Sequence, residues 1–416
     1  MIEFIKLSFS YKDMEKSSLR ELHLNIPKGQ CVLLCGASGC GKTTLTRLVN
    51  GLIPHFFEGK LSGKVTVKGM NVAETEISTL SDSVGTVFQN PRTQFFNTDT
   101  DSEIVFGLEN RMLYMKELKQ QLERVTKDLH IEKLKGCSIF ELSGGEKQKI
   151  AFASVYATNP DIFVLDEPSS NLDMETIDAL RAHLKILKSQ GKTILIVEHR
   201  LYYLMGIADR IIVFDEGQIK KIYSAGEFLT LTDEERRAMG LRATDLQKET
   251  LDVIAGEEGK TRLELKDVSL FYRKTPVIEN ISVKISEGEV IALVGKNGAG
   301  KTTFSRALCG LHKGIKGDYV WDGRGISPKK RQKISYMVMQ DVNYELFAES
   351  VEAECSFGIK NPDADLVAET MDALELTPFA EQHPGTLSGG QKQRLAVAVG
   401  QICKKELIVF DEPTSG

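Results

Sequence analysis

The chain has 416 residues and a formal net charge of −5, with 53 Lys and Arg against 58 Asp and Glu. Apolar residues make up 41% and charged residues 27%, an ordinary globular composition that argues against disordered, collagen-like and membrane-spanning classes. The charge balance gives no electrostatic reason to expect nucleic acid as a partner, and the length predicts two or three domains.

The seven cysteines are scattered along the chain, and none forms a C-x-x-C pair. An odd count at irregular spacing favours reduced thiols in the cytosol over a disulfide framework or a zinc site. The opening residues Met-Ile-Glu-Phe-Ile-Lys lack the basic and apolar regions of a secretory signal, so we expect no such signal there.

The first elements in chain order are strands. Residues 2–11, 21–27 and 63–69 alternate partly between apolar and polar side chains, which predicts a small antiparallel sheet. Residues 31–35 form a short apolar run, a glycine-rich turn follows, and residues 43–52 have helical spacing. Strand, loop and helix in this order are the setting of a phosphate-binding P-loop.

The glycine-rich turn has the full pattern Gly36-x4-Gly41-Lys42-Thr43. Phosphate oxygens need converging backbone N–H groups, and side chains would block their approach. The helix N-terminus adds positive potential, Lys42 can reach the β- and γ-phosphates, and Thr43 can ligate Mg²⁺. The competing interpretation is a chance glycine-rich turn. The predicted nucleotide-binding residues of this loop are Gly36, Ser38, Gly39, Gly41, Lys42, Thr43 and Thr44.

The remaining elements predict a layered fold. Residues 161–166 and 193–198 are apolar runs separated by helical stretches, which predicts a parallel sheet with helices on both faces. Residues 111–135 place apolar groups at helical spacing among charges and predict a helical subdomain. The expected fold class is α/β, with a parallel core sheet, an antiparallel β subdomain and a helical subdomain.

Polar side chains next to these strands suit nucleotide hydrolysis. Asp166 is placed to hold the Mg²⁺ shell, and Glu167 to orient and deprotonate a water. His199 can donate a hydrogen bond to the γ-phosphate, although a lone histidine is usually structural. Gln89 can bind metal or water, but so can many surface glutamines. Tyr11 suits stacking on adenine about as well as core packing.

The chain then repeats these motifs in the same order. Leu142-Ser143-Gly144-Gly145 recurs as Leu387-Ser388-Gly389-Gly390. In the second copy, Glu412 is the predicted base, and Thr302 and Asp411 are the predicted metal ligands. Its other predicted nucleotide-binding residues are Tyr272, Gly295, Asn297, Gly298, Gly300, Lys301, Thr303 and Gln340. We therefore expect a first domain over 1–232, a charged linker over 233–260, and a second domain over 261–416 that is truncated after Asp411-Glu412.

These motifs together resemble the ABC ATPase family, whose signature is the Leu-Ser-Gly-Gly segment. The resemblance implies ATP and Mg²⁺ as cofactors, ATP hydrolysis, and head-to-tail pairing of domains. Each ATP would then lie between one P-loop and the other domain's signature, here Ser143 to Gly145 or Ser388 to Gly390. Asn171-Leu172-Asp173 resembles the family's D-loop. The second copy lacks counterparts of this loop and of His199, so we expect its site and its sheet to be incomplete.

The segment Phe88-Gln89-Asn90-Pro91-Arg92-Thr93-Gln94-Phe95-Phe96 resembles the ATPases of energy-coupling-factor (ECF) importers of vitamins and transition metals. The second copy has Glu345 in place of Gln94. Two ATPase domains fused in one chain, with Asn171, resemble the subgroup linked to thiamine or its pyrimidine precursor. The resemblance implies two membrane partners, an integral T-type transport subunit and a solute-binding subunit, and a peripheral location on the cytoplasmic face of the membrane. Phe95 and Phe96 would contact a membrane subunit or lie in the core.

Three other classes compete with this interpretation. A soluble twin ABC ATPase acting on ribosomes or translation is the alternative, but such proteins usually carry a long basic segment between their domains. Chromosome and DNA-repair ATPases insert a coiled coil or zinc module between Lys42 and Ser143, and neither pattern occurs here. A twin-domain sugar importer does not fit the Gln-Asn-Pro segment.

Overall fold

The computed structural model describes residues 1–12, 17–170, 172–248 and 259–413. Asn171 of the predicted D-loop lies outside the described residues. The chain divides into two compact units, Met1–Leu251 (unit 1) and Asp252–Gly416 (unit 2). None of the helices that the structure describes is both long enough and apolar enough to cross a membrane.

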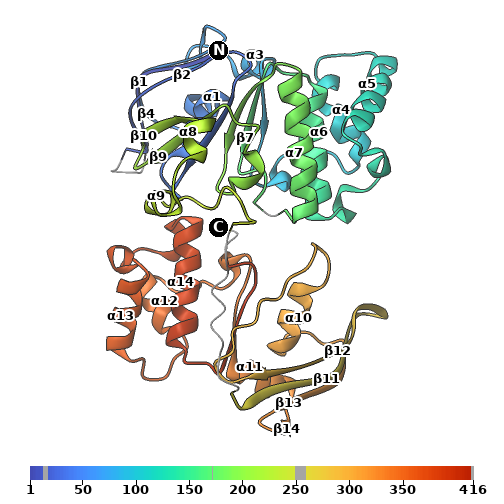
Figure 1. The fold of residues 1–416 in the computed structure, drawn as a ribbon, viewed down its shortest axis with the longest axis vertical. Coiled ribbons are helices and arrows are strands. Elements are labelled where there is room, and N and C mark those ends of the chain that lie inside the picture. Colours follow the sequence, from blue (N-terminus) through green and yellow to red (C-terminus); the bar gives the residue numbers. More distant parts are fainter. Residues whose placement is uncertain (13–16, 171, 249–258, 414–416) are drawn as a thin grey trace. The chain divides into compact units, whose positions relative to one another are not determined.

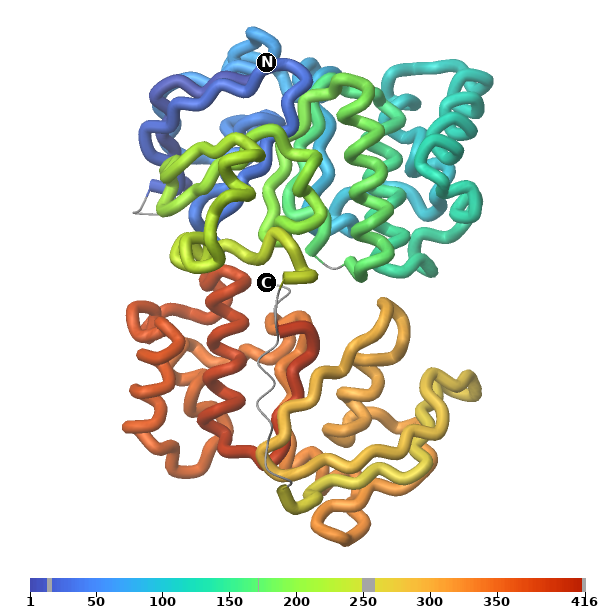
Figure 2. The backbone as a smooth tube through the Cα atoms, in the orientation of Figure 1, coloured from blue at the N-terminus to red at the C-terminus, as the bar shows by residue number. Residues whose placement is uncertain are grey.

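Unit 1 contains two sheets among its described residues (Figure 1), and Figure 2 traces the path of the backbone through them. The antiparallel sheet has the order β2-β1-β4-β5, with β1 Ile2–Tyr11, β2 Leu19–Ile26, β4 Gly59–Val67 and β5 Met70–Asn71. The larger sheet has the order β10-β9-β3-β8-β7-β6, with β3 Cys31–Gly36, β6 Val84–Val87, β7 Ile162–Asp166, β8 Thr193–Val197, β9 Arg210–Asp215 and β10 Gln218–Ser224. Its strands are parallel except β10. The predicted α/β class with an antiparallel subdomain is confirmed.

The helices of unit 1 flank the larger sheet and form a separate group around α6 (Figure 1). The α-helices are α1 Lys42–Val49, α2 Leu52–His55, α3 Ile77–Ser81, α4 Thr100–Glu109, α5 Met115–Asp128, α6 Gly144–Ala157, α7 Met174–Ser189, α8 Ala225–Leu229 and α9 Asp233–Ala238. The 3₁₀ helices are η1 Pro91–Thr93, η2 Glu132–Leu134, η3 Ile139–Glu141 and η4 Tyr202–Leu204. Helices α4 and α5 both pack on α6, and α9 falls inside the segment predicted as a linker.

The strand β3 shows why its apolar run is continuous. Cys31, Leu33 and Cys35 belong to the core on the α6–α7 side of the sheet, whereas Val32 and Leu34 belong to the core shared with α1 and the antiparallel sheet. Successive strand residues face opposite sides, so a strand covered on both faces needs apolar residues at every position. This strand delivers the P-loop to the centre of the sheet edge.

Unit 2 has the same antiparallel sheet but a smaller parallel one. The first has the order β12-β11-β13-β14, with β11 Thr261–Tyr272, β12 Thr275–Ser286, β13 Ile315–Trp321 and β14 Arg324–Gly325. The second pairs β15 Ser335–Val338 with β16 Leu407–Phe410 in parallel. Its helices are α10 Lys301–Leu308, α11 Pro328–Ile334, α12 Val351–Ser356, α13 Ala364–Ala373, α14 Gly389–Ile402, η5 Val342–Tyr344, η6 Thr377–Phe379 and η7 Pro384–Thr386.

Residues 289–294, which precede the second P-loop, form no strand. Val290 is 96% exposed and Val294 is 85% exposed. In unit 1 the corresponding strand, β3, lies between β8 and β9. The described part of unit 2 contains no counterpart of either strand, so these apolar residues have neither ladder partners nor a covered face.

Candidate active site

The P-loop of unit 1 curves around the Lys42 ammonium group. Lys42 is 4% exposed, and its Nζ donates to the carbonyl oxygens of Gly36 at 3.0 Å and Ala37 at 2.7 Å. Burial raises the pKa of the neighbouring Cys40 thiol although the Lys42 charge lowers it, so this cysteine is neutral at pH 7. The loop therefore presents one fixed positive charge beside backbone N–H groups at the start of α1, which suits a phosphate chain.

Two loop glycines are required by their surroundings. A Cβ on Gly36, which has a φ of 143°, would lie 2.1 Å from the carbonyl oxygen of Phe214 in β9. A Cβ on Gly41, which has a φ of 102°, would lie 2.5 Å from the carbonyl oxygen of Ser18. Any other residue at either position would collide with backbone atoms that cannot move aside.

Oxygen atoms suited to Mg²⁺ gather beside the loop. Thr43 Oγ1 donates to Asp166 Oδ1 at 3.2 Å, and Thr46 Oγ1 donates to Asp166 Oδ2 at 3.4 Å. Burial and the adjacent Glu167 carboxylate raise the pKa of Asp166 to about 6. No group of three or more His, Cys, Asp or Glu that could hold a metal occurs among the described residues. Mg²⁺ at nucleotide sites keeps water and phosphate ligands, so one carboxylate and one hydroxyl fit it.

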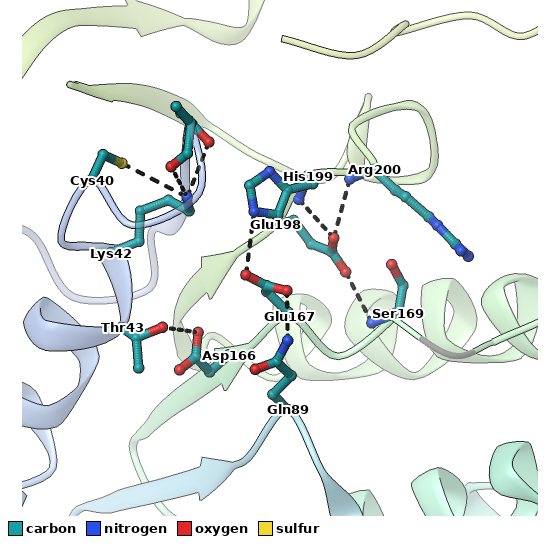
Figure 3. A network of polar contacts seen from close by, with 12 residues as sticks. Cys40, Lys42, Thr43, Gln89, Asp166, Glu167, Ser169, Glu198, His199 and Arg200 are labelled. Atoms are coloured by element: carbon teal, nitrogen blue, oxygen red, sulfur yellow. Dashed lines mark hydrogen bonds and ion pairs between the residues drawn. The ribbon is translucent and has the colours of Figure 1, made fainter. Parts of the chain in front are cut away.

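Three neighbouring strands bring the predicted hydrolytic residues together (Figure 3). Glu167 follows β7, and its Oε2 accepts a hydrogen bond from Gln89 Nε2, after β6, at 2.9 Å. Its Oε1 lies 3.3 Å from Nε2 of His199, after β8. Burial favours a raised pKa of the Glu167 carboxyl, but the hydrogen bond and charge of His199 and the charge of Lys42 outweigh it, and the pKa is lowered. Glu167 is therefore ionised at neutral pH and able to accept a proton.

Unit 2 repeats part of this arrangement. Lys301 Nζ donates to the carbonyl oxygen of Gly295 at 2.8 Å, and Thr302 Oγ1 donates to Asp411 Oδ1 at 3.1 Å. Gln340 Nε2 donates to Glu412 Oε2 at 2.9 Å.

The family model for ABC transporters matches residues 19–170 and 278–415. The chain belongs to the ABC transporter family. It is 55% identical over 422 residues to an ABC transporter ATP-binding protein of Treponema denticola, covering 100% of this chain and 86% of that protein. A second such protein of the same organism is 42% identical, with the same coverage. CbiO1 of Clostridium perfringens, part of the ABC transporter complex CbiONQ, aligns with a TM-score of 0.50 at 27% identity, over 56% of this chain and 91% of its own.

Membership of the family makes this chain an ATPase that binds ATP with Mg²⁺. The signature residues occupy helix starts in both units. Ser143 and Ser388 are the N-caps of α6 and α14, and each forms a capping box with the residue three positions on. Their serines are exposed, as are Gly144 and Gly389. Exposed helix N-termini of this kind present free N–H groups to anions.

The aromatic residues predicted to stack on adenine differ between the units. The Tyr11 hydroxyl lies 3.3 Å from Thr44 Oγ1 and accepts from Arg47 Nη1 at 2.9 Å, and its half-buried ring packs edge-on against Phe9. Tyr272 is 52% exposed. The other predicted loop residues Ser38, Gly39, Asn297, Gly298, Gly300 and Thr303 lie in their P-loops or at the first turn of the following helix.

Sequence reasoning missed three polar residues that contact this site. Thr46 binds Asp166 from the next turn of α1. Glu198 and Arg200 flank His199, and both reach the segment after Glu167. The signal for Glu198 was a carboxylate at the end of an otherwise apolar strand, a place where a charge needs a specific partner.

Proposed function

We propose that this ABC ATPase is the ATP-hydrolysing subunit of an ECF-type importer, bound to the cytoplasmic face of the membrane through an integral transport subunit. The likeness to CbiO1, a component of an ABC transporter complex, supports this proposal. The solute class is a vitamin-like compound, with thiamine or its pyrimidine precursor as the first candidate, or a transition metal.

The proposal rests above all on an exposed aromatic patch next to the Gln89 loop. Phe96 is 76% exposed and stacks on Phe106 with ring centroids 5.0 Å apart, while its neighbour Phe95 is half-buried and packs on the core. Phe140 is 77% exposed, and the adjacent Ile139 N donates to Thr98 O at 2.9 Å, which brings η3 beside this loop. Large exposed aromatic groups gathered from two segments are typical of a protein–protein contact.

The patch connects the proposed partner to the catalytic residues. The chain runs from Gln89, which contacts Glu167, through η1 to Phe96. A membrane subunit bound at Phe96 therefore adjoins the loop that touches the base. ATP binding and hydrolysis would shift the population of that loop, and the partner would convert the shift into movement.

Site-specific photo-crosslinking tests the proposal. A photoreactive phenylalanine analogue replaces Phe96 in the chain expressed in its native cells, and the matched control replaces Phe56, which is 73% exposed in the same unit. We expect membrane-dependent crosslinks to a multi-spanning protein from position 96 and none from position 56. Crosslinks to ribosomal proteins from position 96, or recovery of the chain only in the soluble fraction, would refute the importer and favour the twin ATPase of translation.

A further inference from the structure

The residue before His199 is a buried acid whose surroundings are unusual. Glu198 is 2% exposed, and both of its carboxylate oxygens accept two hydrogen bonds. Oε1 accepts from Ser169 N at 2.9 Å and from Tyr203 Oη at 2.8 Å. Oε2 accepts from His199 N at 2.9 Å and from Arg200 N at 3.1 Å. These four donors replace the water that burial removes from the carboxyl group.

The hydrogen bond from Ser169 N to Glu198 joins two segments that come from different strands (Figure 3). Ser169 lies in the segment after β7, just beyond Glu167, whereas His199 lies in the segment after β8. Arg200 adds a second link, because its Nη1 donates to Leu172 O at 2.9 Å and its Nη2 to Ser170 O at 3.4 Å.

The residues on either side of His199, Glu198 and Arg200, thus hold the segment after β8 against the segment that follows Glu167. A backbone hydrogen bond also joins the two segments where they leave the sheet, because Glu167 N donates to the carbonyl oxygen of Val197 at 2.9 Å. The 3.3 Å contact between Glu167 Oε1 and His199 Nε2 depends on the spacing of these segments. A side-chain contact of that length is lost when either segment shifts by about 1 Å, and such shifts can cost roughly 100-fold in rate.

We propose that Glu198 is a positioning residue for ATP hydrolysis: its carboxylate ties the segment after Glu167 to the segment that carries His199, and so keeps these two side chains in contact. This inference rests on the roles proposed for Glu167 and His199. Glu198 acts through them, because protein donors occupy both of its carboxylate oxygens.

The sharpest perturbation is Glu198→Gln, which keeps the shape of the side chain. Tyr203 Oη can rotate to accept from the new amide, but the N–H groups of Ser169, His199 and Arg200 are fixed donors. One orientation of the amide places its NH₂ group against Ser169 N–H and breaks the link between the segments. The other places it against the N–H groups of His199 and Arg200 and releases the backbone beside His199.

The test is a double-mutant cycle on the full chain, with kcat, KM for ATP and thermal unfolding measured for each variant. We expect Glu198→Gln to lower kcat about tenfold or more with KM changed less than twofold. In the His199→Ala background the same substitution should change kcat less than twofold, because its effect passes through His199. The matched control is Glu103→Gln, an acid that is also 2% exposed and accepts from the N–H groups of Phe96 and Asn97. It should leave kcat within twofold.

The possible outcomes separate the inference from the function on which it rests. Equal losses of kcat from Glu198→Gln in both backgrounds, or a raised KM with kcat unchanged, would overturn the positioning role. An unchanged kcat in His199→Ala would instead refute the proposed role of His199. If Glu198→Gln does not fold, Tyr203→Phe removes one of the four donors, and we expect a two- to threefold loss of kcat that disappears in the His199→Ala background.

Discussion

Unit 2 has Glu345 where unit 1 has Gln94, and this difference should make the stability of unit 2 depend on pH. In unit 1, Gln94 Oε1 accepts from Phe88 N at 3.3 Å, and its Nε2 donates to Ala151 O at 3.3 Å. In unit 2, Glu345 accepts from Met339 N in the same way, but its buried Oε2 has no hydrogen-bond partner among the described residues. A protonated Glu345 can donate as the Gln94 amide does, whereas an ionised one cannot.

Burial raises the pKa of Glu345 to about 7 from its ordinary 4.5, although the Met339 N–H lowers it. Between these two values the folded state holds a proton that the unfolded state releases, so stability falls as pH rises. The contribution is complete below pH 4.5 and is lost as pH passes through about 7. Because one pKa unit corresponds to about 1.4 kcal/mol, the loss in unit 2 amounts to roughly 3 kcal/mol by pH 8.

Trp321 is the only tryptophan of the chain and lies in β13, so its fluorescence reports the unfolding of unit 2 alone. Urea titrations between pH 4.5 and 8 give the free energy of unfolding for the parent chain and for Glu345→Gln. The parent should lose roughly 3 kcal/mol relative to Glu345→Gln over this range. The control Glu349→Gln, at an exposed acid four residues on, should keep the parent's pH profile. Identical pH profiles for the parent and Glu345→Gln would refute the reasoning.

Three further substitutions test the site of unit 1. Glu167→Gln should leave ATP affinity unchanged and lower steady-state turnover by roughly 10²- to 10⁴-fold, and normal turnover would remove Glu167 from the role of base. Lys42→Ala, made in a Lys301→Ala background so that only one site is read, should weaken fluorescent-nucleotide binding about 10- to 100-fold, and unchanged affinity would contradict the phosphate contact. Gly36→Ala should destabilise unit 1 by about 3 kcal/mol in thermal unfolding, whereas Gly39→Ala, with nothing within 4 Å of its Cβ, should cost only about 1 kcal/mol. Equal losses of stability in the two variants would show that the backbone moves to relieve the clash at Gly36.

Much of unit 1 was predictable because its signals are local. The apolar run at 31–35 and the glycines that follow require a buried strand and a tight loop whatever the rest of the chain does. The same reasoning identified Asp166, Glu167 and His199 as neighbours, since parallel strands end at one edge of a sheet.

What the sequence could not supply depends on contacts between distant segments. The sequence left Phe95 and Phe96 with the same two interpretations, a membrane-subunit contact or a place in the core. The structure separates them, because Phe95 packs on the core while the exposed Phe96 stacks on a ring of α4. Glu198 ends a run predicted as a buried strand, but the sequence does not show what its carboxylate contacts, because its partner Ser169 lies 29 positions away. The run at 290–294 is as apolar as its counterpart at 31–35, yet it forms no strand, because the described part of unit 2 offers it no neighbouring strand.

A comparison of the two units shows which contacts of the site need only one pair of parallel strands. In unit 2, β15 and β16 pair in parallel and bring Gln340 to Glu412 at 2.9 Å, the same separation that Gln89 and Glu167 have in unit 1. The contact between glutamine and base is thus a property of one strand pair and its register. The histidine and the carboxylate that positions it come from the next strand, β8, and the P-loop follows the strand beyond that, β3. Each strand of the sheet therefore adds its own residue to the site: β6 and β7 supply the Gln89–Glu167 contact, β8 supplies His199, and β3 leads into the P-loop.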